Sequence, residues 1–510
     1  MTDARKNLIF NFAVFAFTVL WFGVFAVTRI DLHHDAVMLK PAIDVAAGKV
    51  IFRDTFCQYG ALAVWLQALA VKLFGGEIVV IQLLTVFFYG GCAVVSDLIF
   101  RRFLSFPFRL INLALFWGMA PFYIVPMHPW SSVYALFFML LTEEFILRFF
   151  ESGRGWELFG AGSFAACAFL ARHPCGAAIF AAGAAAVGFY AIRFRRSWSA
   201  PAWYVAGTAS ILGAFALYLA VVGAWRDYLV QCFGFVLAFA VERGGNMNPG
   251  EIAKRFFPFN EVLWLVDTIY SLLPLFCMAL LLLAMRRFFG EAAERNPAVG
   301  RRALQYIMPA LAGLASWHQY YPVPCVRHLY WAAIPMFGVF ALFAERLWRS
   351  GRCGRWGRAL AVLLLLAGAV PIAFRFYYGS YPLIKYFPLR RTVDLPGCRH
   401  LWLSPREREL LSSLAGTFEA LPPEIKARGF FNYTPDAVFS VAFPQTGFKH
   451  KMFVNWRRDV YSDYPESAMN YIFTHRPPVL TQQPMALPGY ILLWRGELYG
   501  LEYWFYSPLR

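Results

Sequence analysis

Residues 8–28, LIFNFAVFAFTVLWFGVFAVT, decide the fold of this chain because they form a long apolar block without a charged residue. A helix rises about 1.5 Å per residue, so about 20 apolar residues cross a hydrocarbon core roughly 30 Å thick. Backbone groups in lipid must satisfy their own hydrogen bonds, and the block is therefore expected to be helical. It is longer than the apolar region of a signal peptide, so we interpret it as a membrane anchor.

Similar apolar blocks follow one another up to about residue 376 and then stop. Hydrophobic residues make up 59% of the chain and charged residues 15%, whereas soluble domains carry roughly 25% charged residues. Residues 59–74 are also apolar but are expected to lie along the membrane interface, since a span there would reverse every later loop. We predict an α-helical polytopic membrane protein with about eleven transmembrane helices, at residues 8–28, 78–100, 110–125, 131–150, 157–192 (a hairpin of two), 203–222, 262–285, 303–320, 329–347 and 359–376.

The net charge of +17 is concentrated in alternate connections between the apolar blocks. Arginines cluster at residues 101–109, 193–196, 286–302 and 346–358, and Arg5 and Lys6 precede the first block. This is the positive-inside pattern of membrane proteins, and it argues against a nucleic-acid surface. We therefore expect a multi-pass protein of the bacterial inner membrane, with long periplasmic loops at residues 29–77 and 223–261.

The end of the chain has a different composition and is expected to be a separate domain. We divide the chain into a transmembrane domain, residues 1–376, and a periplasmic α/β domain, residues 377–510. Ser404 and Glu407 have the spacing of a capping box, which predicts a helix start. The nine cysteines show neither CxxC nor Cys/His spacing, so no zinc site or disulfide framework is expected. Strands are predicted at residues 429–432, 452–455, 471–474 and 490–494.

Polar residues that could carry chemistry gather in the expected outer loops. A carboxylate can act as a general base and cations can neutralise a phosphate, so a site acting on a phosphate-bearing lipid would need both. The helix interiors are almost free of charge, which disfavours an ion-coupled transporter. The candidate residues are His34, Asp35, Asp54, His128, Arg172, His173, Lys254, Arg255, Arg327 and His328.

The first outer loop contains HHDAVMLKPAIDVAAG at residues 33–48, RD at 53–54, YG at 59–60 and LFG at 73–75. An acidic motif directly after the first helix, followed by an amphipathic stretch that ends in glycine, resembles the first outer loop of the GT-C glycosyltransferases. These include the protein O-mannosyltransferases and the aminoarabinose transferases of lipid A. The resemblance implies a membrane glycosyltransferase that moves a sugar, with inversion, from a polyprenyl-phosphate donor to a glycolipid, an envelope glycan or a protein.

The same resemblance implies roles for individual residues. Asp35 matches the acidic residue at the family's active site and is expected to be the general base. The family's second acidic motif reads His128-Pro129 here, so Asp54 is the alternative second carboxylate. The other candidate residues are expected to bind substrate. No cofactor is expected, because cationic side chains can stabilise a lipid monophosphate and a divalent metal is permitted rather than required.

Other interpretations stay open. Asp35 could simply cap the helix expected at residues 36–47, and Arg327 could anchor its helix at the headgroups. An O-antigen polymerase or ligase also has about a dozen helices and long outer loops, but it usually lacks an acidic motif after the first helix. A lipid or glycan transporter is a further alternative, for which neither deep charges nor an inverted repeat is found.

Overall fold

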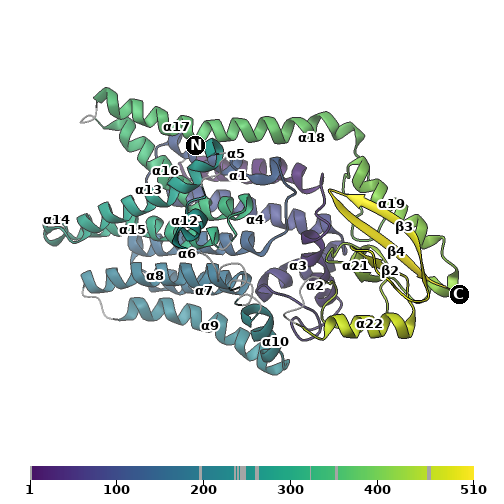
Figure 1. Cartoon of the computed structure of the whole chain (residues 1–510). Helices are drawn as coiled ribbons and strands as arrows, with labels where there is room; N and C mark the ends of the chain where they lie inside the picture. Colours follow the sequence, from purple (N-terminus) through teal and green to yellow (C-terminus); the bar gives the residue numbers. More distant parts are fainter. Residues whose placement is uncertain are drawn as a thin grey trace.

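The computed structural model describes residues 3–509, with gaps at 195–197, 235–236, 238–240, 242–247, 259–263, 322, 351–353 and 456–460. Its helices form an elongated bundle with a mixed α/β unit at one end (Figure 1). Helices occupy all eleven positions at which spans were predicted: α1 (Asp3–Ala26), α4 (Ile78–Phe100), α5 (Phe106–Gly118), α6 (Ser131–Ser152), α7 (Gly155–Ala171), α8 (His173–Arg193), α9 (Ser199–Val221), α13 (Trp264–Phe288), α15 (Pro297–Trp317), α16 (Val326–Arg349) and α17 (Gly354–Arg375).

Among the described residues, seven helices are long and apolar enough to cross a membrane by length and composition: α1, α4, α8, α9, α13, α16 and α17, the last of which runs on beyond Arg375. The helices α5 and α7 are shorter, with 13 and 17 residues. Several short helices join the long ones: η1 (Pro121–Tyr123), α10 (Trp225–Leu229), η2 (Val230–Gly234), α12 (Pro249–Phe256), α14 (Glu291–Arg295), η3 (His318–Tyr320), η4 (Phe376–Ser380), α18 (Tyr381–Tyr386) and η5 (Phe387–Leu389).

Glycines allow α7 and α9 to pack closely. A Cβ atom on Gly162 would lie 2.0 Å from the carbonyl oxygen of Tyr204, and one on Gly207 would lie 2.0 Å from that of Phe159. Small residues at such contacts are typical of helix pairs in membranes, where packing rather than the hydrophobic effect drives association.

Two acidic side chains inside the bundle, Asp97 and Glu144, are paired close to the connection between α4 and α5. Arg109 holds Asp97 at 2.6 Å, and Arg102 holds Glu144 at 2.6 Å. Buried carboxylates with such partners stabilise the fold and need no further function. In Figure 1 α14 lies at the end of the bundle that is far from the α/β unit.

Two helices of the first outer loop lie between the bundle and the α/β unit (Figure 1). They are α2 (His34–Ala46) and α3 (Ala61–Phe74), close to the two amphipathic stretches predicted in this loop. Of the second long loop, predicted at residues 223–261, the structure describes 223–234, 237, 241 and 248–258.

The C-terminal unit is built around one four-stranded sheet of order β1-β2-β4-β3. The strands β1 and β2 are parallel, with Phe431 opposite Val479, whereas β4 is antiparallel to both β2 and β3. The predicted capping box is confirmed at Ser404 and Glu407, which begin α19. The elements are α19 (Pro405–Glu419), α20 (Pro423–Lys426), β1 (Phe431–Tyr433), α21 (Phe439–Ala442), α22 (Tyr464–His475), β2 (Val479–Thr481), β3 (Tyr490–Leu498) and β4 (Leu501–Pro508).

Two of the four predicted strands are wrong. Residues 471–474 belong to α22, because Ala468 and Ile472 are buried one helical turn apart and Pro465 stands in its first turn. Residues 452–455 carry buried side chains but form no strand. The short strand β2 and the long strand β4 were not predicted.

Backbone contacts fasten the C-terminal unit to the first outer loop. Trp402 donates from its amide to the carbonyl of Val27 at 2.7 Å, and Val438 donates to that of Leu32 at 2.9 Å. The guanidinium of Arg390 donates to the carbonyl of Thr28. The segment 27–35 is therefore held between the bundle and the C-terminal unit, and this position creates the candidate site.

Candidate active site

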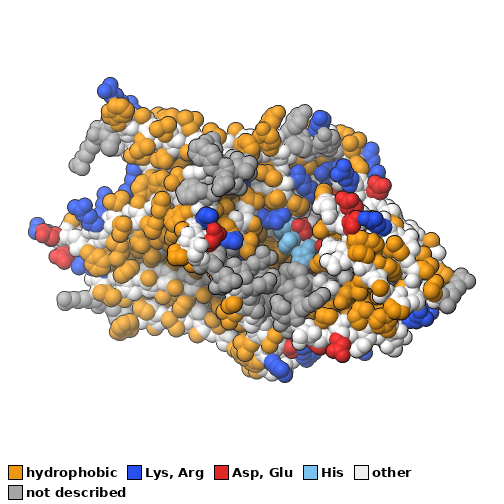
Figure 2. Space-filling view, viewed as in Figure 1, with side chains coloured by type: hydrophobic (Ala, Val, Ile, Leu, Met, Phe, Trp, Pro, Cys, Tyr) orange, Lys and Arg blue, Asp and Glu red, His pale blue; other side chains and the backbone are white. Residues whose placement is uncertain are grey.

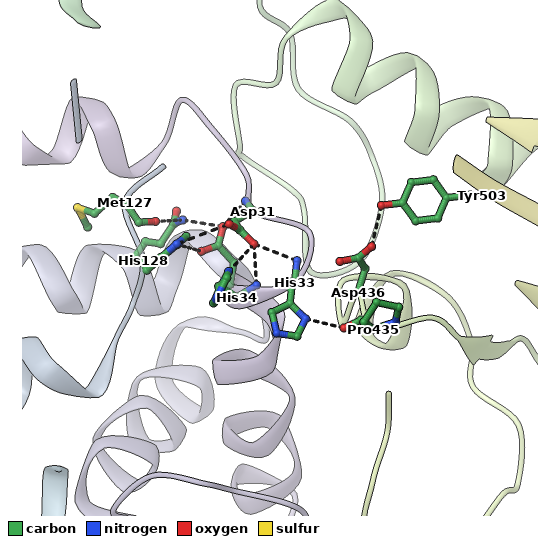
Figure 3. Close-up of polar contacts among 10 residues, drawn as sticks. Asp31, His33, His34, Met127, His128, Pro435, Asp436 and Tyr503 are labelled. Carbon is green, nitrogen blue, oxygen red and sulfur yellow. Dashed lines mark hydrogen bonds and ion pairs between the residues drawn. The ribbon is translucent and has the colours of Figure 1, made fainter. Parts of the chain in front are cut away.

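Ionisable side chains meet where the bundle faces the C-terminal unit. Figure 2 shows histidine side chains between the largely apolar surface of the bundle and the C-terminal unit, with acidic and basic side chains beside them. The close-up in Figure 3 shows that these histidines and carboxylates come from the first outer loop, from the segment before α6 and from the C-terminal unit. We call Asp31, His34, Asp35 and His128 the Asp/His cluster.

Asp35 lies at the centre of the Asp/His cluster and is fully buried. Its Oδ2 atom accepts from the backbone amide of Asp31 at 2.9 Å and from Nε2 of Gln82 on α4 at 3.2 Å. Its Oδ1 atom lies 3.4 Å from Nδ1 of His128. Three separate elements therefore fix the orientation of this carboxylate.

Asp31, rather than Asp35, caps the first helix of the loop. The Oδ1 atom of Asp31 accepts from the backbone amides of His33 at 3.1 Å and His34 at 2.8 Å. Asp35 lies one turn further on, inside α2. Asp31 thus caps the first turn, while Asp35 holds the amide of Asp31 with Oδ2 and turns Oδ1 toward His128.

Two histidines surround Asp31. Nδ1 of His34 lies 3.0 Å from Oδ1 of Asp31, and Nε2 of His128 lies 3.5 Å from Oδ2. The two imidazole rings stack with their centres 4.8 Å apart. Asp31, His34 and His128 each offer one ligand atom, and these atoms all lie within 4.8 Å of one another. Imidazole and carboxylate are the usual ligands of zinc and similar divalent ions, so this donor set fits such an ion.

Burial separates the protonation states of the cluster. Burial raises the pKa of Asp35 well above its ordinary value, and the nearby charge of Asp31 raises it further. Burial alone would also raise the pKa of Asp31, but the hydrogen bond and charge of His34 hold it well below its usual range. Burial, together with the charge of Arg327, lowers the pKa of His128 well below 6.5. The cluster thus combines a carboxylate whose pKa is raised, Asp35, with a neighbouring carboxylate whose pKa is lowered, Asp31.

Two arginines near the cluster have unpaired atoms. Nε of Arg327, at the start of α16, is buried without a hydrogen-bond partner among the described residues. Nη1 of Arg172, between α7 and α8, is likewise buried without a partner in the described part of the chain, and its guanidinium lies 5.9 Å from the centre of the Tyr59 ring. Buried guanidinium atoms without partners are costly, and an anionic ligand would satisfy them.

Other predicted site residues have partners of their own. His173 pairs with the hydroxyl of Tyr228 at 2.9 Å, and Nδ1 of His328 lies 2.8 Å from the carbonyl of Val323. These contacts orient the two rings beside the arginines, since His173 directly follows Arg172 and His328 directly follows Arg327.

The structure does not bring Asp54, Lys254 or Arg255 into the described contacts of the Asp/His cluster. Asp54 forms an ion pair with Arg53 and accepts from the backbone amide of Val50, so it stabilises its own loop. Lys254 is exposed and pairs with Glu251 on α12, the helix that also carries Arg255.

Sequence reasoning missed the contribution of the C-terminal unit. Nδ1 of His33 lies 2.6 Å from the carbonyl oxygen of Pro435. The next residue, Asp436, is buried and accepts a hydrogen bond from Tyr503 at 2.7 Å (Figure 3). It also accepts one from Gln482 at 3.0 Å. No local sequence pattern predicts that these residues belong to the site, because the contact joins positions about 400 residues apart. Gln82 was also missed, since a lone glutamine in an apolar helix has several structural explanations.

No family model and no curated protein matches this sequence. Solved structures do match the fold. ArnT from Cupriavidus metallidurans bound to undecaprenyl phosphate superposes with a TM-score of 0.54 at 12% identity, covering 99% of this chain and 98% of that one. The apo state of the same ArnT gives a TM-score of 0.51 at 13% identity, with the same coverage.

A second protein shares the arrangement. The archaeal oligosaccharyltransferase AglB from Archaeoglobus fulgidus, in complex with an inhibitory peptide and a dolichol-phosphate, has a TM-score of 0.52 at 11% identity. The match covers 94% of this chain and 70% of AglB. At such identities the likeness establishes the fold, which is the one predicted from the first outer loop.

Asp436 predicts a pH dependence of stability. Burial, acting against the hydrogen bond from Tyr503, raises the pKa of Asp436 from 3.8 to about 6. The folded chain therefore retains this proton when the unfolded chain has lost it, and the free energy of unfolding falls as the pH rises from about 4 to about 6. We expect Asp436→Asn to remove this fall, worth about 2–3 kcal/mol. Thermal unfolding in detergent across this range is the measurement. Asp394→Asn, at an exposed carboxylate, is the control, and equal slopes in wild type and Asp436→Asn would disprove the assignment.

Proposed function

We propose that this chain, which has the GT-C fold, is a membrane glycosyltransferase that takes its sugar from a polyprenyl-phosphate donor. The observation that carries the proposal is the buried Asp35 carboxylate, oriented by three elements next to arginines with unpaired buried atoms. Support for the donor comes from the shared fold of ArnT with undecaprenyl phosphate and AglB with dolichol-phosphate. We place the active site and the C-terminal unit on the periplasmic side, because the basic loops lie at the opposite end of the bundle.

The proposed reaction is a single displacement. The acceptor hydroxyl gives its proton to Asp35 as its oxygen attacks the anomeric carbon of the donor. The bond between that carbon and the phosphate oxygen breaks, and the phosphate leaves with the electron pair, so the anomeric configuration inverts. Arg327 and Arg172 stabilise the charge that develops on the leaving phosphate. The acceptor is a glycolipid, an envelope glycan or a protein.

The rival functions explain the site less well. A transporter would place several ionisable residues deep within the bundle, whereas Asp97 and Glu144 are held by arginines near the end remote from the Asp/His cluster, and Glu143, which is buried without a partner among the described residues, directly precedes Glu144. An O-antigen polymerase or ligase acts on a lipid diphosphate, but it offers no role for an oriented carboxylate directly after the first helix.

Asp35→Asn tests the proposed base. The substitution keeps the shape of the side chain but removes the proton acceptor, and we expect the transfer rate to fall about 10²–10⁴-fold. The measurement is transfer of labelled sugar from polyprenyl-phosphate donors to the envelope fraction by the purified protein. Asp394→Asn, which changes an exposed carboxylate, should retain full activity. Full activity of Asp35→Asn would exclude Asp35 as the base.

Arg327→Ala tests the proposed phosphate contact. Loss of one charge-assisted hydrogen bond should weaken donor binding by about 1.5–3 kcal/mol. Affinity for the polyprenyl-phosphate donor is measured in detergent, where bilayer headgroups are absent. Arg287→Ala, at an exposed arginine in the last turn of α13, is the control and should bind normally. Unchanged affinity of Arg327→Ala would leave this residue as a headgroup anchor.

A divalent cation on Asp31, His34 and His128 is a second possibility for the chemistry of the site. One observation favours it: Nε2 of His128 is buried without a hydrogen bond among the described residues, although a carboxylate oxygen lies 3.5 Å away. A bound cation would supply positive charge beside the leaving phosphate. We expect dialysis against EDTA to lower the transfer rate and Zn²⁺ or Mn²⁺ to restore it. Activity that survives EDTA unchanged would establish the metal-free scheme.

A further inference from the structure

An open cavity lies between the first outer loop and the C-terminal unit, beside the Asp/His cluster but separate from it. Its empty volume is about 690 Å³. One wall is formed by Lys40, Asp44 and Lys49, on and after α2. The opposite wall comes from the C-terminal unit and includes Phe448 and Tyr464. None of the roles proposed above uses this cavity.

The charges on the first wall do not balance. Lys40 and Lys49 lie 2.7 Å and 2.9 Å from the same carboxylate, that of Asp44. Asp44 is buried and also accepts from the hydroxyl of Thr55 at 2.9 Å. Two ammonium groups thus share one carboxylate, because the other carboxylate of this wall, that of Asp54, is paired with Arg53 at 2.9 Å. The side chain of Lys49 is 49% exposed, so one positive charge remains available to a ligand in the cavity.

The second wall offers ring faces and polar groups. The rings of Phe448 and Tyr464 lie 6.0 Å apart, and the imidazole of His450 stacks on Phe448 at 5.8 Å. Gln445 and Thr446 add an amide and a hydroxyl to the lining. Flat apolar faces with a few convergent polar groups suit a sugar ring, which has an apolar face and an edge of hydroxyls.

The cavity and the Asp/His cluster share structural supports. Lys40 follows Asp35 by five residues on α2, which places it about 7.5 Å further along the helix axis. Asn432, which also lines the cavity, donates to the carbonyl of Asp436 at 3.0 Å. The neighbouring Pro435 carbonyl contacts His33. A glycan of more than one sugar, or a glycolipid headgroup, can therefore occupy the cavity while another part reaches Asp35.

We propose that this cavity binds the acceptor, and that the acceptor is a carbohydrate carrying a negative group such as a phosphate or a carboxylate. Lys49 and Lys40 hold the anionic group, and the Phe448 and Tyr464 rings hold the sugar. This inference rests on the proposed transferase function, since it assigns the acceptor of that reaction.

Binding of glucose 1-phosphate to the full-length protein in detergent, measured by titration calorimetry, tests the inference. Lys49→Gln removes the exposed ammonium and should weaken this binding about tenfold or more, because a charge-assisted contact is lost. Lys72→Gln, at an exposed lysine on α3 outside the cavity, is the matched control and should bind as wild type does. Loss of binding in Arg327→Ala but not in Lys49→Gln would place the probe at the donor site and overturn the assignment.

Each result decides a separate point. Equal affinities of Lys49→Gln and wild type would overturn the assignment. Glucose and inorganic phosphate are each expected to bind more weakly than glucose 1-phosphate; phosphate binding equally well would remove the sugar from the proposal. Tighter binding of a tetraglutamate peptide would indicate a protein acceptor instead. Because binding is measured without turnover, wild-type protein that binds the probe but transfers no sugar would refute the transferase and leave the cavity standing.

Discussion

The absence of water in the bilayer core governs this molecule. Every backbone group there must be paired inside a helix, and a charge is tolerated only beside its counter-charge. Asp97 and Glu144 follow the second rule, each held by an arginine, whereas the two carboxyl oxygens of Glu143 are buried without a hydrogen-bond partner among the described residues. A site that needs several acids and cations close together is therefore expected at the end of the bundle, where the segment 27–35 leaves the first helix.

At that end, enclosure comes from the C-terminal unit. It covers the segment 27–35 through contacts to main-chain carbonyls and so keeps Asp35 out of bulk water. Burial makes the carboxylate a stronger proton acceptor, while the ionised Asp31 and the arginines fix the local field. The same covering creates the cavity lined by Lys40 and Lys49. The fold therefore places a proton acceptor, a cationic region and a polar cavity around one short loop.

The sequence predicted much of this arrangement, and the failures have physical reasons. Long apolar blocks and alternating arginines predicted the positions of the helices, since an apolar block of about 20 residues crosses a hydrocarbon core of about 30 Å once as a helix. The fold and Asp35 followed from the first outer loop. Residues 471–474 were mistaken for a strand because a short apolar run does not reveal its period. The structure alone identifies Asp31, Gln82 and the Pro435–Asp436 segment as parts of the site, because their partners are distant in the sequence. Asp54, which was singled out by its place in the same loop, pairs with Arg53 outside the described contacts of the Asp/His cluster.

The contacts that join the C-terminal unit to the first outer loop have an evolutionary consequence. At Val27, Thr28, Leu32 and Pro435 the acceptor is a peptide carbonyl, which every amino acid supplies. The contacts at Val27 and Leu32, whose donors are also backbone amides, tolerate almost any substitution but not an insertion or a deletion, since one added residue would shift every later carbonyl. The contacts at Thr28 and Pro435 also need the side chains of Arg390 and His33. At these backbone contacts the length of each segment therefore matters more than the identity of its side chains. The folds of ArnT and AglB match this one at only 11–13% identity, so the architecture does not depend on a particular sequence.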